Sequence, residues 1–391
     1  MRYIGSNCFS FRFFVVLLTT LFLSGGSLYA GSGAPITGKS PKHTLQAKRV
    51  IRDLKRTSKR TKPYLGHQDA LLSGQSWMIS YKDTLYETSD IYNVCGKYPY
   101  VLGLDLGFIE MGGEENIDRV RVWQREGAAK AHNKRGGIIT VSWHMCNPVT
   151  DSTAWDCTAG NVVARIINDI NIREKYCSWL DIGADFLNKL VDNRGHKIPV
   201  LFRPFHECNI NGFWWSGKAC SDEEFIELWK ITFNYLVNKK GMKQLIWVYS
   251  PYNMQTEEEI GARYPGDELV DVIGFERYQL DAKTLQEGAE RFAEGTSHGI
   301  DITLSFAKPR KKIVAFTETG YTGVKYDKWW TDGLGKAIAN KKIAYVHLWR
   351  NGYSNSYYFG PCPKSTSCSN FIEFLKKNRV GMLNYKPLIK E

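Results

Sequence analysis

The chain contains eight short runs of mainly apolar residues, and longer segments with helical periodicity separate them. Near-continuous apolar runs of this length are typical of parallel strands that are buried on both faces. Eight such strands alternating with helices predict an α/β fold, the (β/α)8 barrel. The expected strands are 63–66, 100–106, 138–143, 198–205, 245–249, 270–275, 313–316 and 343–348, and the clearest helices are 117–133, 181–191, 222–238 and 285–294.

A doubly wound sheet is the alternative arrangement of alternating strands and helices. It would carry a phosphate-binding glycine loop after its first strand, and no such loop follows residues 63–66. No linker, internal repeat or low-complexity stretch interrupts the chain after residue 41. We therefore expect a single barrel domain over residues 42–391, preceded by a leader at 31–41 that is rich in Gly, Ser and Pro.

The first thirty residues predict an export signal peptide, 1–30. Arg2 and Arg12 flank an apolar run at 13–23, and Ala30 is a suitable last residue before cleavage. The run is shorter than the ~20 residues that span a bilayer. We therefore expect a periplasmic or extracellular protein without stable membrane insertion, and a membrane anchor is the less favoured alternative.

The cysteine count is compatible with an exported protein. Eight of the nine cysteines follow the signal, and an even number allows disulfides. The sequence does not choose among the many possible pairings, but the shortest closures are the natural guess. These are Cys146–Cys157, Cys208–Cys220 and Cys362–Cys368. Because no CxxC pair is present, a zinc site is not indicated.

The chain is basic, with a formal net charge of +12. Its Lys and Arg residues are scattered, apart from a cluster at 48–62, and no nucleic-acid motif accompanies them. We therefore expect a solvated basic surface and no nucleic-acid partner.

Polar residues follow the apolar runs, where a barrel would gather them on one face. Active sites of such barrels lie on the face formed by the carboxyl ends of the strands. In chain order these ends carry His67 to Asp69, Asp105, Trp143 and His144, Arg203, His206 and Glu207, Glu276 to Tyr278, Glu318, and Trp349 to Asn351.

Glu207 and Glu318 fit the chemistry of glycoside hydrolysis, which needs two carboxyl groups flanking one bond. A retaining site separates them by about 5–5.5 Å, whereas an inverting site leaves room for a water. The acid must stay protonated, and an apolar wall raises its pKa. The nearby aromatic residues that can supply this wall are Phe205, Phe213, Trp214 and Trp215. The nucleophile must stay ionised, and Tyr278 is the natural hydrogen-bond donor to it.

Five motifs together resemble glycoside hydrolase family 26. They are GHQD (66–69), WH..NP (143–148), RPFHE (203–207), FTETG (316–320) and HLWRN (347–351), in order and at barrel spacing along the mature chain. The two glutamate motifs are the most specific of the five. The resemblance implies a barrel enzyme that is most commonly an endo-1,4-β-mannanase and acts with retention of configuration.

The resemblance also implies roles for individual residues. Glu207 corresponds to the acid/base and Glu318 to the nucleophile, which Tyr278 holds. The other residues implied to line the site are His206 beside the acid/base, His144 and Trp349 at the cleavage point, and Arg350 at the next sugar outward.

The chain departs from the family pattern in two places. The family often reads HExxGxWxWWG after the acid/base, but this chain reads HECNINGFWWSG, so Phe213 replaces a displaced tryptophan. Trp214 and Trp215 are kept as substrate-binding candidates, although adjacent side chains point apart and one of the two is expected in the core. Trp155 is either a core residue or a sugar platform. Glu276 stands where the family often has Asp and is a third acidic residue without an assigned role.

Three other functions compete with mannan hydrolysis. A metalloprotease needs HExxH, and position 210 is Ile, so we exclude it. The same family includes β-1,3-xylanases and mixed-linkage β-glucanases, and only the resemblance favours mannan over these substrates. A non-catalytic glycan-binding barrel is disfavoured because both glutamates are present. We predict a monomeric, cofactor-independent and metal-independent retaining endo-1,4-β-mannosidase that hydrolyses β-mannan, glucomannan or galactomannan by double displacement.

Overall fold

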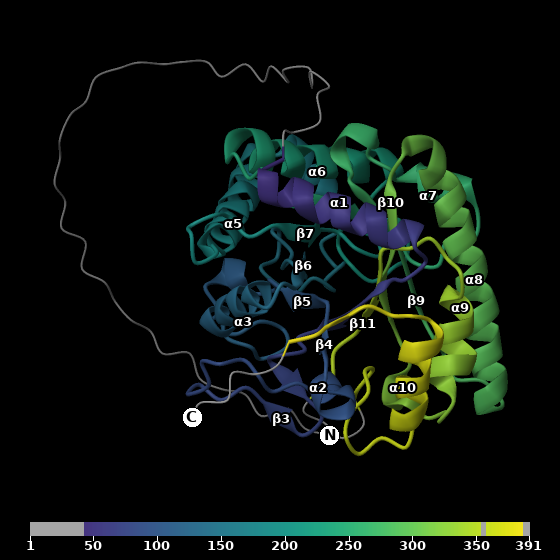
Figure 1. The fold of residues 1–391 in the computed structure, drawn as a ribbon. Coiled ribbons are helices and arrows are strands. Elements are labelled where there is room, and N and C mark those ends of the chain that lie inside the picture. Colours follow the sequence, from purple (N-terminus) through teal and green to yellow (C-terminus); the bar gives the residue numbers. More distant parts are fainter. Residues whose placement is uncertain (1–42, 353–356, 386–391) are drawn as a thin grey trace, which may run out of the picture. The chain divides into compact units, whose positions relative to one another are not determined.

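The computed structural model describes residues 43–352 and 357–385. Within these ranges eight parallel strands close into a barrel in the order β1-β11-β10-β9-β8-β7-β6-β5, with helices around them (Figure 1). The (β/α)8 fold expected from the sequence is therefore confirmed. The predicted signal peptide and the leader at 31–41 lie outside the described residues.

All eight expected strands form close to their expected bounds. Most are buried at every residue, which explains why their sequences are continuous apolar runs. The barrel strands are β1 (Tyr64–Gln68), β5 (Val101–Asp105), β6 (Ile138–Ser142), β7 (Val200–Arg203), β8 (Leu245–Tyr249), β9 (Val272–Tyr278), β10 (Ile313–Gly320) and β11 (Tyr345–Leu348). Two small antiparallel sheets pair β2 (Ser73–Gly74) with β3 (Trp77–Met78) and β4 (Tyr98–Pro99) with β12 (Met382–Leu383).

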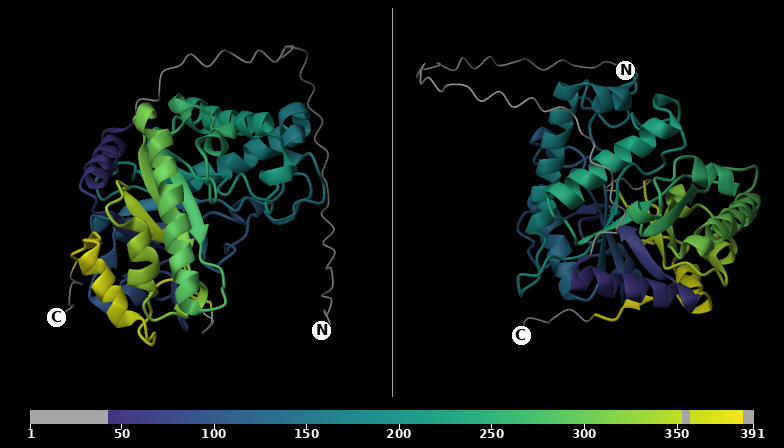
Figure 2. Two further views of the ribbon diagram at one scale, coloured as in Figure 1. Left: turned by 90° about the vertical axis from the view of Figure 1, so that its right-hand side faces the viewer. Right: turned by 90° about the horizontal axis from the view of Figure 1, so that it is seen from above.

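The helices surround the strands, as both views in Figure 2 show. They are α2 (Asp90–Cys95), α3 (Val122–Lys134), α4 (Val162–Asn168), α5 (Ile170–Lys189), α6 (Asp222–Phe233), α7 (Glu257–Ala262), α8 (Leu285–Arg310), α9 (Lys336–Ile338) and α10 (Cys368–Lys377). π-helical turns follow α6 at Asn234–Lys239 and precede α9 at Trp330–Gly335. Single 3-10 turns occupy Ile109–Met111, Gly217–Ala219, Asp267–Leu269 and Thr322–Val324.

The start of α6 agrees with the sequence, whereas two other predicted helices are too short. Ser221 caps α6: its hydroxyl accepts from the Glu224 amide at 3.2 Å, and the Glu224 carboxylate accepts from the Ser221 amide at 2.9 Å. The helix expected from residue 181 begins at Ile170, where the Asp169 carboxylate caps it. The helix expected at 285–294 continues to Arg310.

The basic cluster at 48–62 forms most of a helix that the sequence analysis did not predict, α1 (Leu45–Lys59). Ala47 and Leu54 on its inner face are fully buried and pack with Val101, Ile138 and Ile313, which stand at the first positions of their strands. Helix α1 therefore covers the N-terminal end of the barrel (Figure 1). Its Lys and Arg side chains face solvent, as the expected basic surface requires.

The expected disulfides do not form in the structure. All eight described cysteines are free thiols, so the pairs Cys146–Cys157, Cys208–Cys220 and Cys362–Cys368 are wrong as structural assignments. The Cys368 thiol donates instead to the carbonyl of Cys362 at 3.0 Å, and the Cys220 thiol donates to the carbonyl of Trp215 at 3.3 Å. A short separation in the sequence is a weak guide to disulfide pairing, because the Cβ atoms of the two cysteines must also point toward each other.

Within residues 43–352 and 357–385, no helix combines the length and the hydropathy that crossing a bilayer requires.

Candidate active site

The two predicted catalytic glutamates meet at the carboxyl end of the barrel. Glu207 follows β7, and Glu318 lies in β10, where the register against β9 shifts between Phe316 and Glu318. A carboxylate oxygen of Glu207 lies within 4.8 Å of one of Glu318. This separation matches a retaining site and is too small for the water that an inverting site holds between its carboxyl groups.

Two donors contact the carboxylate of Glu318. The Tyr278 hydroxyl donates to Oε1 at 2.7 Å, and Nη2 of Arg203 donates to Oε2 at 2.5 Å. The expected contact between Tyr278 and Glu318 is therefore present in the structure, and Arg203, to which the sequence analysis gave no role, adds a positive charge beside Glu318.

Glu207 has the opposite environment. Burial, and after it the charge of Glu318, raises the pKa of Glu207 to about 7, against the opposing effects of Arg203 and His144. Its backbone has φ 53°, a left-handed conformation that is strained for a glutamate. The Glu207 amide donates to the carbonyl of Ser250 at 2.9 Å, which anchors this turn to β8. A pKa near neutrality suits a group that must first give and then take a proton.

Glu276, which had no assigned role, lies in the same cluster. It is fully buried at the end of β9 and forms an ion pair with Nη1 of Arg203, while the Thr317 hydroxyl donates to it at 3.2 Å. Burial raises the pKa of Glu276 well above its usual range, and the neighbouring charges of Glu318 and Glu207 add to this effect while Arg203 opposes it. Arg203 therefore links the third carboxyl group to the nucleophile.

The three carboxyl groups are also the set among the described residues whose oxygens lie close enough together to hold a cation. Arg203 already contacts two of them, Glu276 and Glu318. The guanidinium supplies the positive charge that a metal would otherwise bring. The expectation of a metal-independent site stays a prediction.

His144 lies beside the catalytic pair with a fixed ring orientation. Its Nδ1 lies 2.8 Å from Oδ2 of Asp105, and that carboxylate also accepts from the Ser142 hydroxyl at 2.7 Å. Burial alone would lower the pKa of His144, but Asp105 raises it above its usual value. The other ring nitrogen, Nε2, lies 3.2 Å from Nε2 of His206. Burial and the charge of His144 lower the pKa of His206 well below its usual range, so His206 is neutral beside its partner.

Trp349 and Arg350 follow β11 on the far side of the mouth from Glu207. The ring of Trp349 lies 6.2 Å from that of His144, and its Nε1 donates to the Tyr357 hydroxyl at 3.3 Å. Nε of Arg350 lies 2.5 Å from Oδ1 of the buried Asp118, and its guanidinium lies 5.1 Å from the Tyr357 ring. Arg350 is thus held between a carboxylate and an aromatic face, neither of which the sequence analysis had linked to it.

The sequence profile Glycosyl hydrolase family 26 matches residues 48–294, more than half of the chain. The chain belongs to glycoside hydrolase family 26. A family 26 β-mannanase structure from Bacteroides ovatus superimposes with a TM-score of 0.81 at 33% identity and covers 88% of this chain and 96% of that one.

Two curated family relatives are both mannan endo-1,4-β-mannosidases. The protein of Bifidobacterium adolescentis is 30% identical over 316 residues, which make up 74% of this chain. This chain spans only 30% of the length of that relative. The protein of Bacillus subtilis is 29% identical over 282 residues, which make up 68% of this chain and 71% of that protein.

The two adjacent tryptophans of this family 26 chain are buried in the core. Trp214 and Trp215 are both fully buried, and their indole nitrogens donate to the carbonyls of Met145 and His206 at 2.9 and 3.1 Å. The prediction that they bind substrate is therefore wrong. Alternation along an extended chain would bury only one of them, but residues 213–216 form a turn, so both rings pack inward.

Trp155 is an aromatic side chain that reaches the surface beside the site. Its indole is 49% exposed and stacks on His144 with ring centroids 5.2 Å apart. Phe213, which replaces the displaced family tryptophan, is nearly buried and stacks on Trp215 at 4.6 Å. Trp155 therefore offers the exposed apolar face that Phe213 does not.

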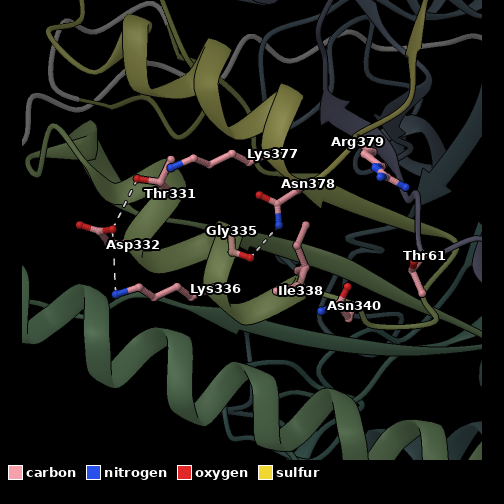
Figure 3. A pocket seen from close by; sticks show the side chains of 11 residues that line it. Thr61, Thr331, Asp332, Gly335, Lys336, Ile338, Asn340, Lys377, Asn378 and Arg379 are labelled. Atoms are coloured by element: carbon pink, nitrogen blue, oxygen red, sulfur yellow. Dashed lines mark hydrogen bonds and ion pairs between the residues drawn. The ribbon is translucent and has the colours of Figure 1, made fainter.

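Two open clefts lie outside the catalytic centre. One, of about 580 Å³, borders the loop after β7 near Glu207. The other, of about 540 Å³, is shown in Figure 3 and is lined by Lys336, Lys377, Arg379 and their neighbours. Because Thr61 and Asn340 in its wall precede β1 and β11, this second cleft belongs to the N-terminal end of the barrel, away from the catalytic glutamates.

Proposed function

We propose that the protein is a retaining endo-1,4-β-mannanase that hydrolyses β-mannan, glucomannan or galactomannan. The observation that carries this proposal is the pair Glu207 and Glu318, whose carboxylate oxygens lie within 4.8 Å of each other. Burial raises the pKa of Glu207, whereas Glu318 accepts hydrogen bonds from Arg203 and Tyr278. The names of the curated relatives and of the Bacteroides structure support mannan as the substrate.

The reaction proceeds in two displacements. The Glu318 carboxylate attacks the anomeric carbon while the Glu207 carboxylic acid gives its proton to the departing oxygen, which leaves with the electron pair of the broken bond. Glu207 then removes a proton from water, and the resulting hydroxide displaces Glu318 from the sugar. Each step returns the catalytic pair to the charge state that the next step needs.

The surrounding residues position the sugars for both displacements. We assign His144, His206, Trp349 and Trp155 to the walls of the site, with Arg350 at the next sugar away from the departing group. Trp155 supports this assignment through its exposed stacking face, and Arg350 through its fixed position beside Asp118.

We further propose that the protein is exported and acts as a monomer in the periplasm or outside the cell. The charged and apolar pattern of residues 1–30 supports export. N-terminal sequencing of the protein recovered from the medium or the periplasm tests cleavage near Ala30, and size-exclusion chromatography with light scattering tests the monomer.

Hydrolysis is tested by incubating the purified protein with β-1,4-mannan, β-1,3-xylan and mixed-linkage β-glucan and measuring new reducing ends. We expect cleavage of mannan, a loss of about 10²–10⁴-fold in Glu207→Gln and no detectable turnover in Glu318→Gln. Glu258→Gln, an exposed glutamate on α7, serves as the control and should retain activity. Preference for xylan or glucan would overturn the substrate, and retained activity in Glu318→Gln would overturn the mechanism.

A further inference from the structure

Helix α1 and the residues directly after it carry more than half of the net positive charge of the chain. Residues 45–62 contain eight Lys and Arg residues and a single acidic residue, Asp53, a net charge of +7 out of the formal +12 of the chain. No step of the reaction proposed above uses these cations. All eight are exposed: Lys48, Arg49, Arg52, Lys55, Arg56, Lys59, Arg60 and Lys62.

Helical spacing gathers several of these cations along the outer side of α1. Lys48, Arg52, Lys55 and Lys59 follow one another at intervals of three or four residues, which places them on the same side of a helix. The other side carries the buried Leu54 and packs against the barrel. A helix of 15 residues is about 22 Å long, so the charge is spread along a broad surface.

The acidic side chains that lie closest to α1 neutralise little of this charge. Asp53 pairs with Arg56 at 2.5 Å. Asp271, which directly precedes β9, lies 2.9 Å from Nε2 of His43. Within residues 43–352 and 357–385, Arg52 forms no ion pair with an acidic side chain. The outer side of α1 therefore keeps a surplus of positive charge.

The positive charge continues into the cleft shown in Figure 3. Thr61, two residues after the end of α1, lines this cleft together with Lys377 and Arg379. The Gly381 amide donates to the carbonyl of Pro63 at 2.8 Å. This bond holds the segment that follows α10 beside the segment that follows α1, so cations from two distant parts of the chain share one surface.

The cleft cations differ in how far they are neutralised. Lys336 lies 4.0 Å from Asp332, and Lys377 lies 2.5 Å from Glu373. Arg379 is exposed and has no ion-pair partner among the residues that the structure describes. We call the exposed cations of residues 48–62 together with Arg379 the basic face.

The basic face and the catalytic glutamates lie at opposite ends of the barrel. Helix α1 packs on the first residues of the strands, whereas Glu207 follows β7 and Glu318 lies near the end of β10 (Figure 1). A flat partner that contacts α1 therefore leaves the mouth of the barrel pointing away from it. An enzyme held in this way stays open to its substrate.

The chemistry of the basic face suits a bilayer that contains anionic phospholipids. Clusters of about four to eight Lys and Arg residues are attracted to such a surface by charge alone. A polysaccharide is instead gripped by exposed aromatic faces, and none of the described residues of α1 or of the cleft wall is aromatic. The sequence adds that the leader at 31–41 joins the proposed export signal to the start of α1.

We propose that the basic face docks the protein onto a bilayer of anionic phospholipids, with the mouth of the barrel facing away from the lipid. The contact is electrostatic and involves no insertion, because the apolar side of α1 is already buried against the barrel. The inference adds a location to the proposed function and does not depend on which glycan is cleaved.

Vesicle co-sedimentation tests the docking with the protein purified after signal cleavage. We expect the protein to bind vesicles made of equal parts of phosphatidylcholine and phosphatidylglycerol, and not vesicles of phosphatidylcholine alone. Binding should be lost at high salt, because the Debye length falls from about 10 Å at 0.1 M to about 3 Å at 1 M ionic strength.

Two variants locate the contact. The triple variant Lys48→Gln, Lys55→Gln and Lys59→Gln changes exposed side chains of α1 and should lower the partition coefficient for the anionic vesicles about 100-fold. Arg379→Gln changes one cation in the segment after α10 and should lower it about fivefold. The second variant keeps the test valid if the first folds poorly.

A matched control removes the same charge from the other end of the barrel. The exposed residues Lys218, Lys283 and Lys364 follow strands β7, β9 and β11. Changing all three to Gln should leave the partition coefficient close to that of the wild-type protein. In addition, kcat/KM for a soluble mannan oligosaccharide should be the same with and without anionic vesicles, because docking leaves the mouth open.

Wild-type binding by both α1 and Arg379 variants, or equal losses in the α1 variant and the matched control, would overturn the inference. A loss of oligosaccharide cleavage on vesicle binding would place the mouth against the lipid and would overturn it as well. Retention on a polygalacturonate gel without binding to the vesicles would replace the lipid by an anionic polysaccharide. A protein that binds the vesicles as described but cleaves no glycan would support the docking while the proposed function fails.

Discussion

At the scale of single residues, the site distinguishes two chemically identical carboxyl groups by their surroundings. Glu318 accepts hydrogen bonds from a tyrosine hydroxyl and a guanidinium. Glu207 lies buried near the charge of Glu318, and its pKa rises to about 7. Arg203 takes part in both effects, because it binds the nucleophile directly and limits how far the pKa of Glu207 rises.

The raised pKa of Glu207 predicts the alkaline limb of the activity profile. The acid acts in its protonated form, so kcat/KM for mannan oligosaccharides should be level below pH 7 and fall about tenfold per pH unit above it. A dinitrophenyl β-mannobioside needs no proton donor, so the same limb should vanish for kcat/KM with that substrate. A decline that begins near pH 4.5, the ordinary pKa of a glutamate, would contradict this environment for Glu207.

Glu276, which stands where the family often has Asp, is linked to the nucleophile through Arg203. It stands at the end of β9, where its carboxyl group shares Arg203 with Glu318. The sequence could show that Glu276 lies near the site, because β9 ends there. It could not show the shared guanidinium, because Arg203 is 73 positions away in the chain.

At the scale of elements, the polar ends of the strands were predictable and the helix lengths were not. Strand positions follow from continuous apolar runs, and these survive in the structure nearly unchanged. Helices α5 and α8 extend beyond their predicted bounds because tertiary packing stabilises turns that local periodicity does not mark. Helix α1 was missed because its many Lys and Arg residues conceal a narrow apolar stripe.

The buried stripe of α1 predicts a contribution to stability. Leu54 is fully buried against the barrel end, so Leu54→Ala should lower the free energy of unfolding by about 2–5 kcal/mol. Urea denaturation measures this loss. Arg52→Ala on the exposed side of the same helix should change stability by less than about 0.5 kcal/mol. Equal effects of the two substitutions would mean that α1 does not pack as described.

At the scale of the whole molecule, two buried histidines make the free energy of unfolding depend on pH. Burial lowers the pKa of both His67 and His132 to about 4, from an ordinary value of 6.5. The unfolded chain therefore binds more protons than the folded chain between these two pH values. Stability should fall as pH decreases from 6.5 to 4, by on the order of 3 kcal/mol for each histidine.

Urea midpoints measured at pH 7, 5.5 and 4 test this coupling. His132 lies in α3 and contacts the carbonyl of Tyr100 at 3.2 Å, away from the catalytic pair. His132→Asn should therefore reduce the pH dependence of the midpoint while leaving the activity of the folded enzyme intact. A pH dependence equal to that of the wild-type protein would show that His132 does not titrate on unfolding.

The sequence by itself determined the barrel, the places of its eight strands and the two glutamates at their ends. These features are local, because apolar runs and the residues that follow them can be read without knowing which strands become neighbours. Only the tertiary structure decided the distance of at most 4.8 Å between carboxylate oxygens of the two glutamates, the sharing of Arg203, the burial of Trp214 and Trp215, and the cleft that borders the loop after β7. Each depends on distances between segments that are far apart in the chain, and barrel closure sets those distances.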